Sequence, residues 1–218
     1  MTSVMKDVFT SNRERYVLAT GAYNYKFTYQ NIRKALEKRL RQFRTDYIDA
    51  FLFLGVMKDQ EFPGKVRDEL RKLKEEGKVK AIGMSCHDRK FAGRLILENA
   101  LDLFMIRYDA AHRGAERDIF PFCGGDNPAI VGYTATRWSY LLRRPRHWPK
   151  TGTIPDAGMC YRFVLSNPNV HVCLTAPRNE EQLRQNLAAL SKGPLSDEES
   201  QFMASFGDAV YRDYKWFM

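Results

Sequence analysis

The feature that most constrains this chain is a repeated alternation of short apolar segments with charged segments of helical period. The apolar segments have the length of strands, and several are apolar on both faces, as in AFLFL, KAIGMS and AIVGY. Strands of this kind are typical of parallel sheets that are covered by helices. The alternation therefore predicts an α/β fold with a parallel sheet, either open and doubly wound or closed into a barrel.

We expect six strands and seven helices. The predicted strands are Tyr16–Thr20, Tyr47–Leu54, Val79–Ser85, Leu103–Tyr108, Ala129–Thr134 and Val170–Thr175. The predicted helices are Tyr29–Phe43, Lys65–Glu76, Lys90–Asn99, Ala115–Phe122, Gly158–Leu165, Asn179–Leu190 and Asp197–Lys215.

Local signals support the ends of several of these helices. Thr28 is a candidate cap for the first helix, and Asn179 followed by Gln182 is a suitable start for the sixth. Gly77 stands where a helix C-terminal glycine is expected, directly before a strand. No glycine-rich fingerprint follows any strand, which disfavours a dinucleotide-binding Rossmann fold.

Composition places the chain among ordinary globular proteins. Its 218 residues are 44% hydrophobic and 28% charged, which predicts one domain over residues 1–218, irregular over 1–12 and ending in a helix within 196–218. No apolar run approaches the ~20 residues of a membrane span. The N-terminus lacks the apolar region of a secretory signal. The four cysteines form no C-x-x-C pair, so we expect reduced thiols in a cytoplasmic protein and no metal site.

The net charge of +9 raises the question of a nucleic-acid partner. One basic stretch, Arg33–Arg44, interleaves its cations with apolar residues at helical spacing, which indicates an amphipathic helix with a solvated outer face. The other, Arg143–Lys150, contains two prolines and is predicted to be a loop that could bind an anion. Neither stretch lies in a recognised nucleic-acid module, so this class of partner is disfavoured.

Four segments, taken in this order, resemble the aldo-keto reductase family. They are NIRKALEKRLRQFRTDYID at 31–49, LRKLKEEGKVKAIGMSCH at 70–87, RYDAAHRGAERDIFPFC at 107–123 and VHVCLTAPRNEEQLRQNLAAL at 170–190. The resemblance covers about residues 13–200 and implies a (β/α)8 TIM barrel that binds ligands at the carboxyl ends of its strands.

This barrel is expected to be incomplete. About six βα units are present, and the family's first two have no counterpart in this chain. A sheet that lacks two staves has two open edges, and open edges invite pairing with another chain. We therefore expect a homo-oligomer that forms through the exposed barrel edges, or poor solubility, unless the sequence belongs to a longer product.

The resemblance implies a reduction of carbonyl substrates by hydride transfer from NADPH, with a tyrosine as proton donor and a lysine, an aspartate and a histidine around it. The tyrosine and the aspartate would lie in the absent units. The lysine position is Gly21, and the histidine position is Leu54, or Gly55 with an offset of one. Glycine and leucine neither donate a proton nor carry charge. We therefore predict no catalytic residue.

Other groups on the same face are weaker candidates for the missing proton donor. Tyr23, Tyr25 and Lys26 follow Gly21, but a solvated loop is the simpler interpretation. His87 and His112 also follow strands, and each is more simply a polar rim residue or a structural donor.

The cofactor side of the family pattern is better preserved. Ser85 matches the serine that contacts the nicotinamide amide, although Cys86 and Met105 replace the asparagine and glutamine that accompany it. Tyr133 matches the aromatic residue beneath the nicotinamide ring, with core packing an equal alternative, and the loop Thr134–Leu141 would surround the pyrophosphate. The predicted cofactor-binding residues are Ser85, Tyr133, Thr134, Arg178, Gln182 and Asn186.

The last three of these match the family's adenosine-phosphate site. A helix N-terminus favours an anion, and the Arg178 guanidinium suits a 2′-phosphate. Gln182 and Asn186 are spaced to share one helical face. The main hypothesis is an NADP(H)-binding homologue with impaired or lost carbonyl reduction. The alternatives are an active oxidoreductase of which this chain is a truncated part, and a non-enzymatic basic interaction module with Arg143, Arg144 and Arg146 as its contacts.

Overall fold

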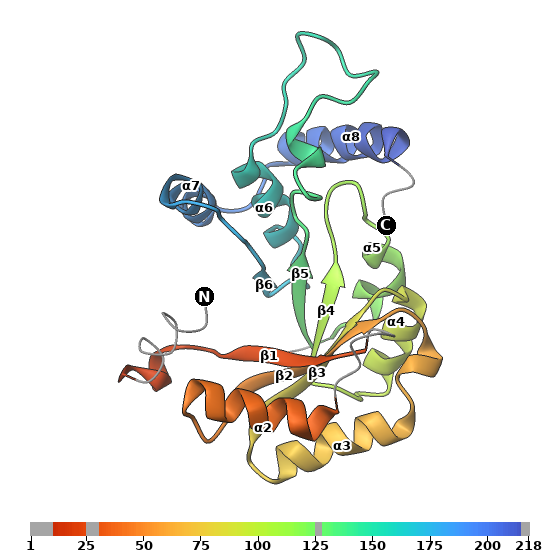
Figure 1. Cartoon of the computed structure of the whole chain (residues 1–218). Helices are drawn as coiled ribbons and strands as arrows, with labels where there is room; N and C mark the ends of the chain where they lie inside the picture. The colour runs from red at the N-terminus through yellow and green to blue at the C-terminus, as the bar shows by residue number, and fades with distance from the viewer. Residues whose placement is uncertain (1–10, 25–30, 125–127, 215–218) are drawn as a thin grey trace. The chain divides into compact units, whose positions relative to one another are not determined.

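The computed structural model describes residues 11–24, 31–124 and 128–214, and Figure 1 shows its elements. The strands are β1 (Ala19–Tyr23), β2 (Ile48–Val56), β3 (Val79–Cys86), β4 (Leu103–Arg107), β5 (Ala129–Tyr133) and β6 (Val172–Cys173). The α-helices are α2 (Ile32–Phe43), α3 (Gly64–Glu75), α4 (Arg89–Leu97), α5 (Ala115–Asp118), α6 (Ala157–Leu165), α7 (Glu180–Lys192) and α8 (Asp197–Asp213). Short 3₁₀ helices η1 to η4 cover Arg13–Arg15, Asp59–Glu61, Phe120–Phe122 and Tyr140–Leu142.

The six strands form one sheet whose spatial order, β1 to β6, is their order in the chain. β1 pairs with β2, β2 with β3, and β5 with β6, each pair parallel. A helix follows most strands, which provides the crossover that parallel neighbours need. This confirms the predicted α/β fold with a parallel sheet of six strands.

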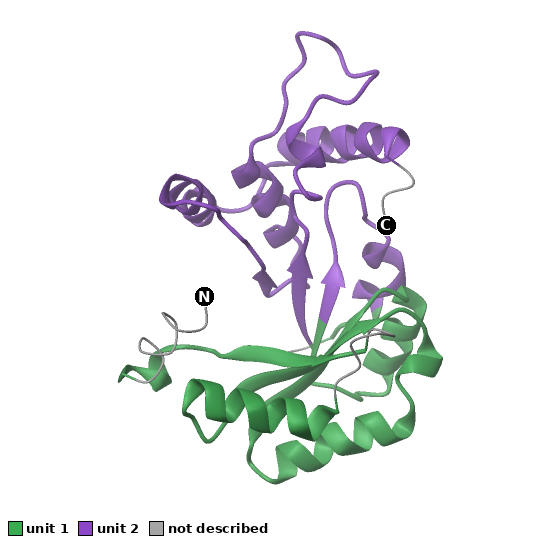
Figure 2. Ribbon diagram, viewed as in Figure 1, with its two compact units in different colours: residues 1–104, 122–128 green, residues 105–121, 129–218 purple. Residues whose placement is uncertain are grey.

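The chain divides into two compact units, residues 1–104 with 122–128 and residues 105–121 with 129–218 (Figure 2). Unit 1 holds β1 to β3, against which α2 and α3 pack. Its core includes the fully buried Phe51 and Phe53 of β2 and Met84 of β3, together with Leu36 and Leu70 from the two helices. Each helix buries one apolar stripe and exposes its charged residues, as the amphipathic spacing predicts.

Unit 2 has a separate core around α6 and α8. The core cluster includes the buried Leu141, Cys160, Met203 and Phe206, and Trp148 of the long loop packs against it. The Trp148 ring lies 4.9 Å from that of Phe206 in an edge-to-face arrangement. The loop that carries the second basic stretch is therefore anchored by an aromatic contact.

Three local predictions are wrong. The first strand begins at Ala19 rather than Tyr16, and Val17 is exposed. The first helix is capped by Asn31, whose side chain accepts from the Lys34 N–H, whereas Thr28 lies outside the described residues. The helix predicted over Ala115–Phe122 ends at Asp118 and gives way to a 3₁₀ turn, because Pro121 lacks an N–H and disfavours a helical residue before it.

Other predicted ends are confirmed. Asn179 caps α7, and its side chain accepts from the Gln182 N–H at 2.9 Å. Gly77 has φ of +72° directly after α3, and its N–H is bonded to the carbonyl of Lys74. This is the left-handed residue that ends many helices.

Candidate functional site

The middle of β1 carries the position at which the resemblance expects a lysine, Gly21, which the predicted strand end at Thr20 would have placed just beyond the strand. Gly21 pairs in register with Leu52 of β2, and a β-carbon at Gly21 would collide with the Leu52 carbonyl oxygen and lie 3.0 Å from Cγ of Leu54. A larger residue therefore requires the two strands to separate. The side chain of Leu54 fills the space beside this glycine.

Polar groups at the carboxyl ends of β1 and β2 come from η2, the 3₁₀ turn that follows β2. Glu61, at the end of η2, accepts from the Met57 N–H at 2.7 Å and from Nδ2 of Asn24 at 3.3 Å. These contacts cap the ends of the two strands. Tyr23 is 37% exposed at the end of β1, while Tyr25 and Lys26 lie outside the described residues.

Ser85 and Cys86 end β3, and both are buried. Burial raises the pKa of the Cys86 thiol to about 12, and its Sγ donates to the carbonyl of Asp88 at 3.2 Å. A thiol with this pKa stays protonated at neutral pH, so it is neither a nucleophile nor a charged ligand. In unit 1 the nicotinamide side of the predicted site is thus a buried serine beside an inert thiol.

In unit 2, Tyr133 ends β5 and Thr134 begins an unusual loop. Thr134, Arg137, Trp138 and Ser139 all have positive φ, from 48° to 71°. Each such non-glycine residue costs of order 1–3 kcal/mol, and residues of this kind cluster at binding sites. The Thr134 hydroxyl donates to the Tyr133 carbonyl at 2.6 Å, and the Arg137 N–H donates to the Thr134 carbonyl at 2.6 Å.

The N-terminus of α7 brings together the other three predicted residues. The Arg178 N–H donates to Oε1 of Gln182 at 2.9 Å, and Nδ2 of Asn186 donates to Oγ1 of Thr175 at 2.7 Å. Gln182 and Asn186 are four residues apart on the helix, so they share a face. Arg178 is exposed. The stretch therefore carries an exposed guanidinium and two side-chain amides, one of which already donates to Thr175.

An anion bound at this stretch would also face two carboxylates. Glu180 and Glu181 lie in the first turn of α7. Glu180 is paired with Arg184 at 2.6 Å, and Glu181 accepts from Nε2 of Gln185 at 2.7 Å. Both acids therefore have partners within α7.

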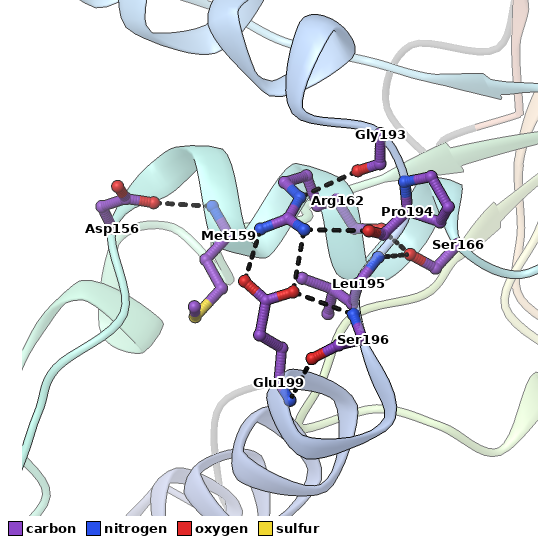
Figure 3. A network of polar contacts seen from close by, with 9 residues as sticks. All are labelled: Asp156, Met159, Arg162, Ser166, Gly193, Pro194, Leu195, Ser196 and Glu199. Atoms are coloured by element: carbon purple, nitrogen blue, oxygen red, sulfur yellow. Dashed lines mark hydrogen bonds and ion pairs between the residues drawn. The ribbon is translucent and has the colours of Figure 1, made fainter.

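The position of α7 is set by a polar network around Arg162 of α6 (Figure 3). Arg162 donates to the carbonyls of Gly193 and Pro194, each at 2.8 Å, and forms a two-pronged ion pair with Glu199 of α8 at 2.7 and 2.8 Å. Ser166 accepts from the Leu195 N–H at 2.7 Å. The connection between α7 and α8 is thereby fixed to α6.

Two arginines of unit 2 have surroundings that the sequence does not signal. Arg137 is the largest fully buried side chain of the described residues, and Arg107 ends β4 with its guanidinium 5.3 Å from the centre of the Trp138 ring. In the sequence both resemble ordinary surface cations, so no pattern identifies them. Apolar spacing around Arg137, in GYTATRWSYLL, is the only hint of its burial.

Other classes of site find little support. Among the described residues, no group of three or more His, Cys, Asp and Glu side chains is arranged to hold a metal. No helix of that part of the chain has the length and apolar character needed to cross a bilayer.

His112 is held at 3.3 Å by the buried Asp109, which makes it a structural group. In the basic loop, Arg144 donates to the carbonyls of Pro149 and Gly152.

Comparison with known proteins points to one family. The model of the "Aldo/keto reductase family" matches residues 2–147, about two thirds of the chain. The NADH-specific methylglyoxal reductase of Escherichia coli is 22% identical over 84% of this chain, and the match spans 66% of that relative's length.

Solved structures agree on the fold. Aldo-keto reductase AKR11C1 from Bacillus halodurans, in its holo form, has a TM-score of 0.76 at 20% identity and covers 95% of this chain and 77% of its own. An aldo/keto reductase from Klebsiella pneumoniae in complex with NADP and acetate has a TM-score of 0.72 at 22% identity and covers 95% and 75%. Both support the predicted (β/α)8 type of barrel, of which six units are present.

Proposed function

Because this chain belongs to the aldo/keto reductase family, we propose that it binds NADP(H) and that its carbonyl reduction is impaired or lost. The binding half is carried by the Arg178, Gln182 and Asn186 cluster at the N-terminus of α7. The catalytic half is carried by Gly21, where no side chain fits between β1 and β2.

The residues at the N-terminus of α7 favour NADPH, which carries a 2′-phosphate, over NADH. A guanidinium presents a planar fork of donors that matches two oxygens of a phosphate. Helix amides and their dipole add favourable interactions with an anion. The relative from Klebsiella pneumoniae is described in complex with NADP, whereas the relative from Escherichia coli is described as NADH-specific. Both cofactors therefore need to be compared.

Fluorescence titration of the protein with NADPH and with NADH tests the binding half. We expect NADPH to quench the fluorescence with a Kd in the micromolar range. Arg178→Ala should raise that Kd about tenfold or more, because a charged hydrogen-bond donor to the 2′-phosphate is lost. NADH binding should change little in the same variant. Lys192→Ala removes an exposed cation from the last turn of the same helix and is the matched control. Equal losses for NADH and NADPH would contradict the 2′-phosphate role.

Turnover of methylglyoxal and simple aldehydes with NADPH tests the catalytic half. General acid catalysis contributes about 10²- to 10⁴-fold. We therefore expect kcat at least about a hundredfold below the ~10 s⁻¹ of a typical enzyme. Reduction at ordinary rates by the purified chain would show that some other group donates the proton, with Tyr23 and His87 the first candidates for substitution.

A further inference from the structure

One strongly charged surface of unit 2 has no part in the proposed function. It is the basic loop, residues 143–155, which lies between η4 and α6 (Figure 1). The chain contains no Asp or Glu from residue 127 to residue 155. The cations of the loop all have exposed side chains, and they are Arg143, Arg144, Arg146 and Lys150.

These four cations lack the ion pairs that other arginines of unit 2 make. Arg113 pairs with Asp208 and Arg162 pairs with Glu199, each at 2.7 Å. Within the residues that the structure describes, no cation of the basic loop is in an ion pair. The charge of the loop is therefore available to a partner outside the chain.

The basic loop is anchored at several points. The ring of Trp148 packs edge-to-face against Phe206 of α8, with 4.9 Å between the ring centroids. The Arg144 guanidinium donates to the carbonyls of Pro149 and Gly152, which joins two parts of the loop. A β-carbon at Gly152 would lie 2.9 Å from Nε1 of Trp148, so the turn closes tightly against the indole. A loop held in this way loses little conformational entropy when a partner binds.

The helix against which the loop packs is acidic. α8 contains five acidic residues and one arginine, and its Asp213 accepts a hydrogen bond from the Arg146 N–H. The positive potential therefore ends where the loop meets α8. A long polyanion that continued past the loop would be repelled by these acids, whereas a short acidic segment fits the loop alone.

The aromatic residues of this region do not favour a nucleic acid. Trp148 is the only Phe, Tyr or Trp of the loop, and it packs against Phe202 and Phe206. The exposed Trp138, which precedes the loop, carries the Arg107 guanidinium over its ring. The loop thus lacks the stacking platforms on which single strands bind. It also lacks the helix or paired strands that enter a groove of a duplex.

We propose that the basic loop docks a short acidic segment of another protein, whose Asp and Glu side chains pair with Arg143, Arg146 and Lys150. A guanidinium fork matches the two oxygens of a carboxylate. Arg144 keeps the loop in the shape that presents the other three cations. Docking at this loop does not depend on cofactor binding at α7, because different residues are involved.

Fluorescence polarisation of a fluorescein-labelled decaglutamate peptide, titrated with the full chain, tests the proposal. We expect a Kd in the micromolar range at low salt, and a higher Kd at high salt because exposed ion pairs are screened. Combined Arg143→Gln, Arg146→Gln and Lys150→Gln substitutions should raise the Kd about tenfold or more, because three exposed ion pairs are lost. The same variant should unfold at the wild-type temperature, since these side chains are exposed and have no ion pair in the described structure.

The matched control removes the same charge from the other basic stretch. Lys34→Gln, Lys38→Gln and Arg41→Gln change three exposed cations of α2 and should alter the Kd less than about twofold, because only the net charge falls. Arg144→Lys keeps the charge of the loop but loses the fork that joins its two parts. We expect this variant to raise the Kd for the peptide about threefold, since the loop is then less well preorganised.

The same titration with labelled oligothymidylate, and sedimentation with phosphatidylserine vesicles, compares the other classes of anion. Both should bind more weakly than the peptide, because α8 repels an extended negative surface. Tighter binding of either one through the three loop cations would overturn the proposal and assign the loop to a nucleic acid or a membrane. Equal effects of the loop and α2 variants on the peptide would also overturn it, as would a wild-type chain that does not bind the peptide.

Discussion

Gly21 shows how a single residue limits the chemistry of this chain. Its place in β1 brings the backbones of β1 and β2 so close that a β-carbon would collide with the carbonyl oxygen of Leu52. The strand pairing is parallel and in register through this point. A lysine introduced at this position would therefore disturb the sheet before it supplied any charge, and Gly21→Lys alone is not expected to restore carbonyl reduction.

The consequence for stability is direct. We expect Gly21→Ala to lower the free energy of unfolding by about 1–3 kcal/mol, the usual effect of adding volume to a packed core. Gly64→Ala is the matched control, because a β-carbon there meets nothing within 4 Å and alanine favours the helix that begins at this residue. Chemical denaturation measures both. Equal stabilities for the two variants would mean that β1 and β2 separate without cost.

At the scale of elements, the network that holds the connection between α7 and α8 includes an ion pair and a helix cap that share Glu199. Glu199 accepts from Arg162 and from the Ser196 N–H, and Ser196 in turn caps α8. Because the Arg162 hydrogen bond and then the Ser196 N–H stabilise the carboxylate, the pKa of Glu199 falls from 4.5 to about 2. Folding therefore favours the charged form of this residue.

The sign of the pH dependence follows from that shift. The stabilisation from Glu199 is complete above about pH 4.5 and is lost as the pH falls toward about 2. We expect Glu199→Gln to lower the unfolding temperature at pH 7 and to reduce the loss of stability between these two pH values. Glu198→Gln removes an exposed charge from the same first turn and is the control. Parallel pH profiles for the two variants would contradict the role of the ion pair.

Elements with a strong pattern could be predicted from the sequence, and those set by tertiary contacts could not. The strand Ile48–Val56 and the helix Glu180–Lys192 follow from continuous apolar character and a clear cap. The first strand lies three residues later than its apolar run predicts, because the register with β2 pairs Ala19–Tyr23 with Ala50–Leu54. β6 is two residues long, shorter than its apolar run predicts.

The candidate site divides in the same way. Arg178, Gln182 and Asn186 occupy a continuous stretch after a strand, so a linear motif identifies them. The surroundings of Arg137 depend on the carbonyl of Tyr214, 77 residues away in the chain. A contact between residues so far apart leaves no local pattern in the sequence. The sequence therefore predicts neither the burial of Arg137 nor the lack of partners for Nε and Nη1 among the described residues.

At the scale of the whole chain, the sheet ends at β6, which is an edge strand and pairs only with β5 among the described residues. Its residue Val172 and the following Leu174 are exposed. In the same unit, α7 exposes a leucine stripe formed by Leu183, Leu187 and Leu190. This spacing places all three leucines on one face of the helix. An open strand edge and an exposed apolar helix face each favour association between chains.

We therefore expect the chain to self-associate, with a mass that rises with protein concentration in size-exclusion chromatography coupled to light scattering. Leu187→Glu combined with Leu190→Glu should shift the protein toward the monomer, because burial of the stripe would then desolvate two carboxylates. Leu97→Glu is the matched control, since Leu97 is 66% exposed on α4, outside this surface. A wild-type chain that stays monomeric at every concentration would contradict this prediction. Association reduced equally by the Leu97 variant would instead assign the effect to net charge, since both variants lower it.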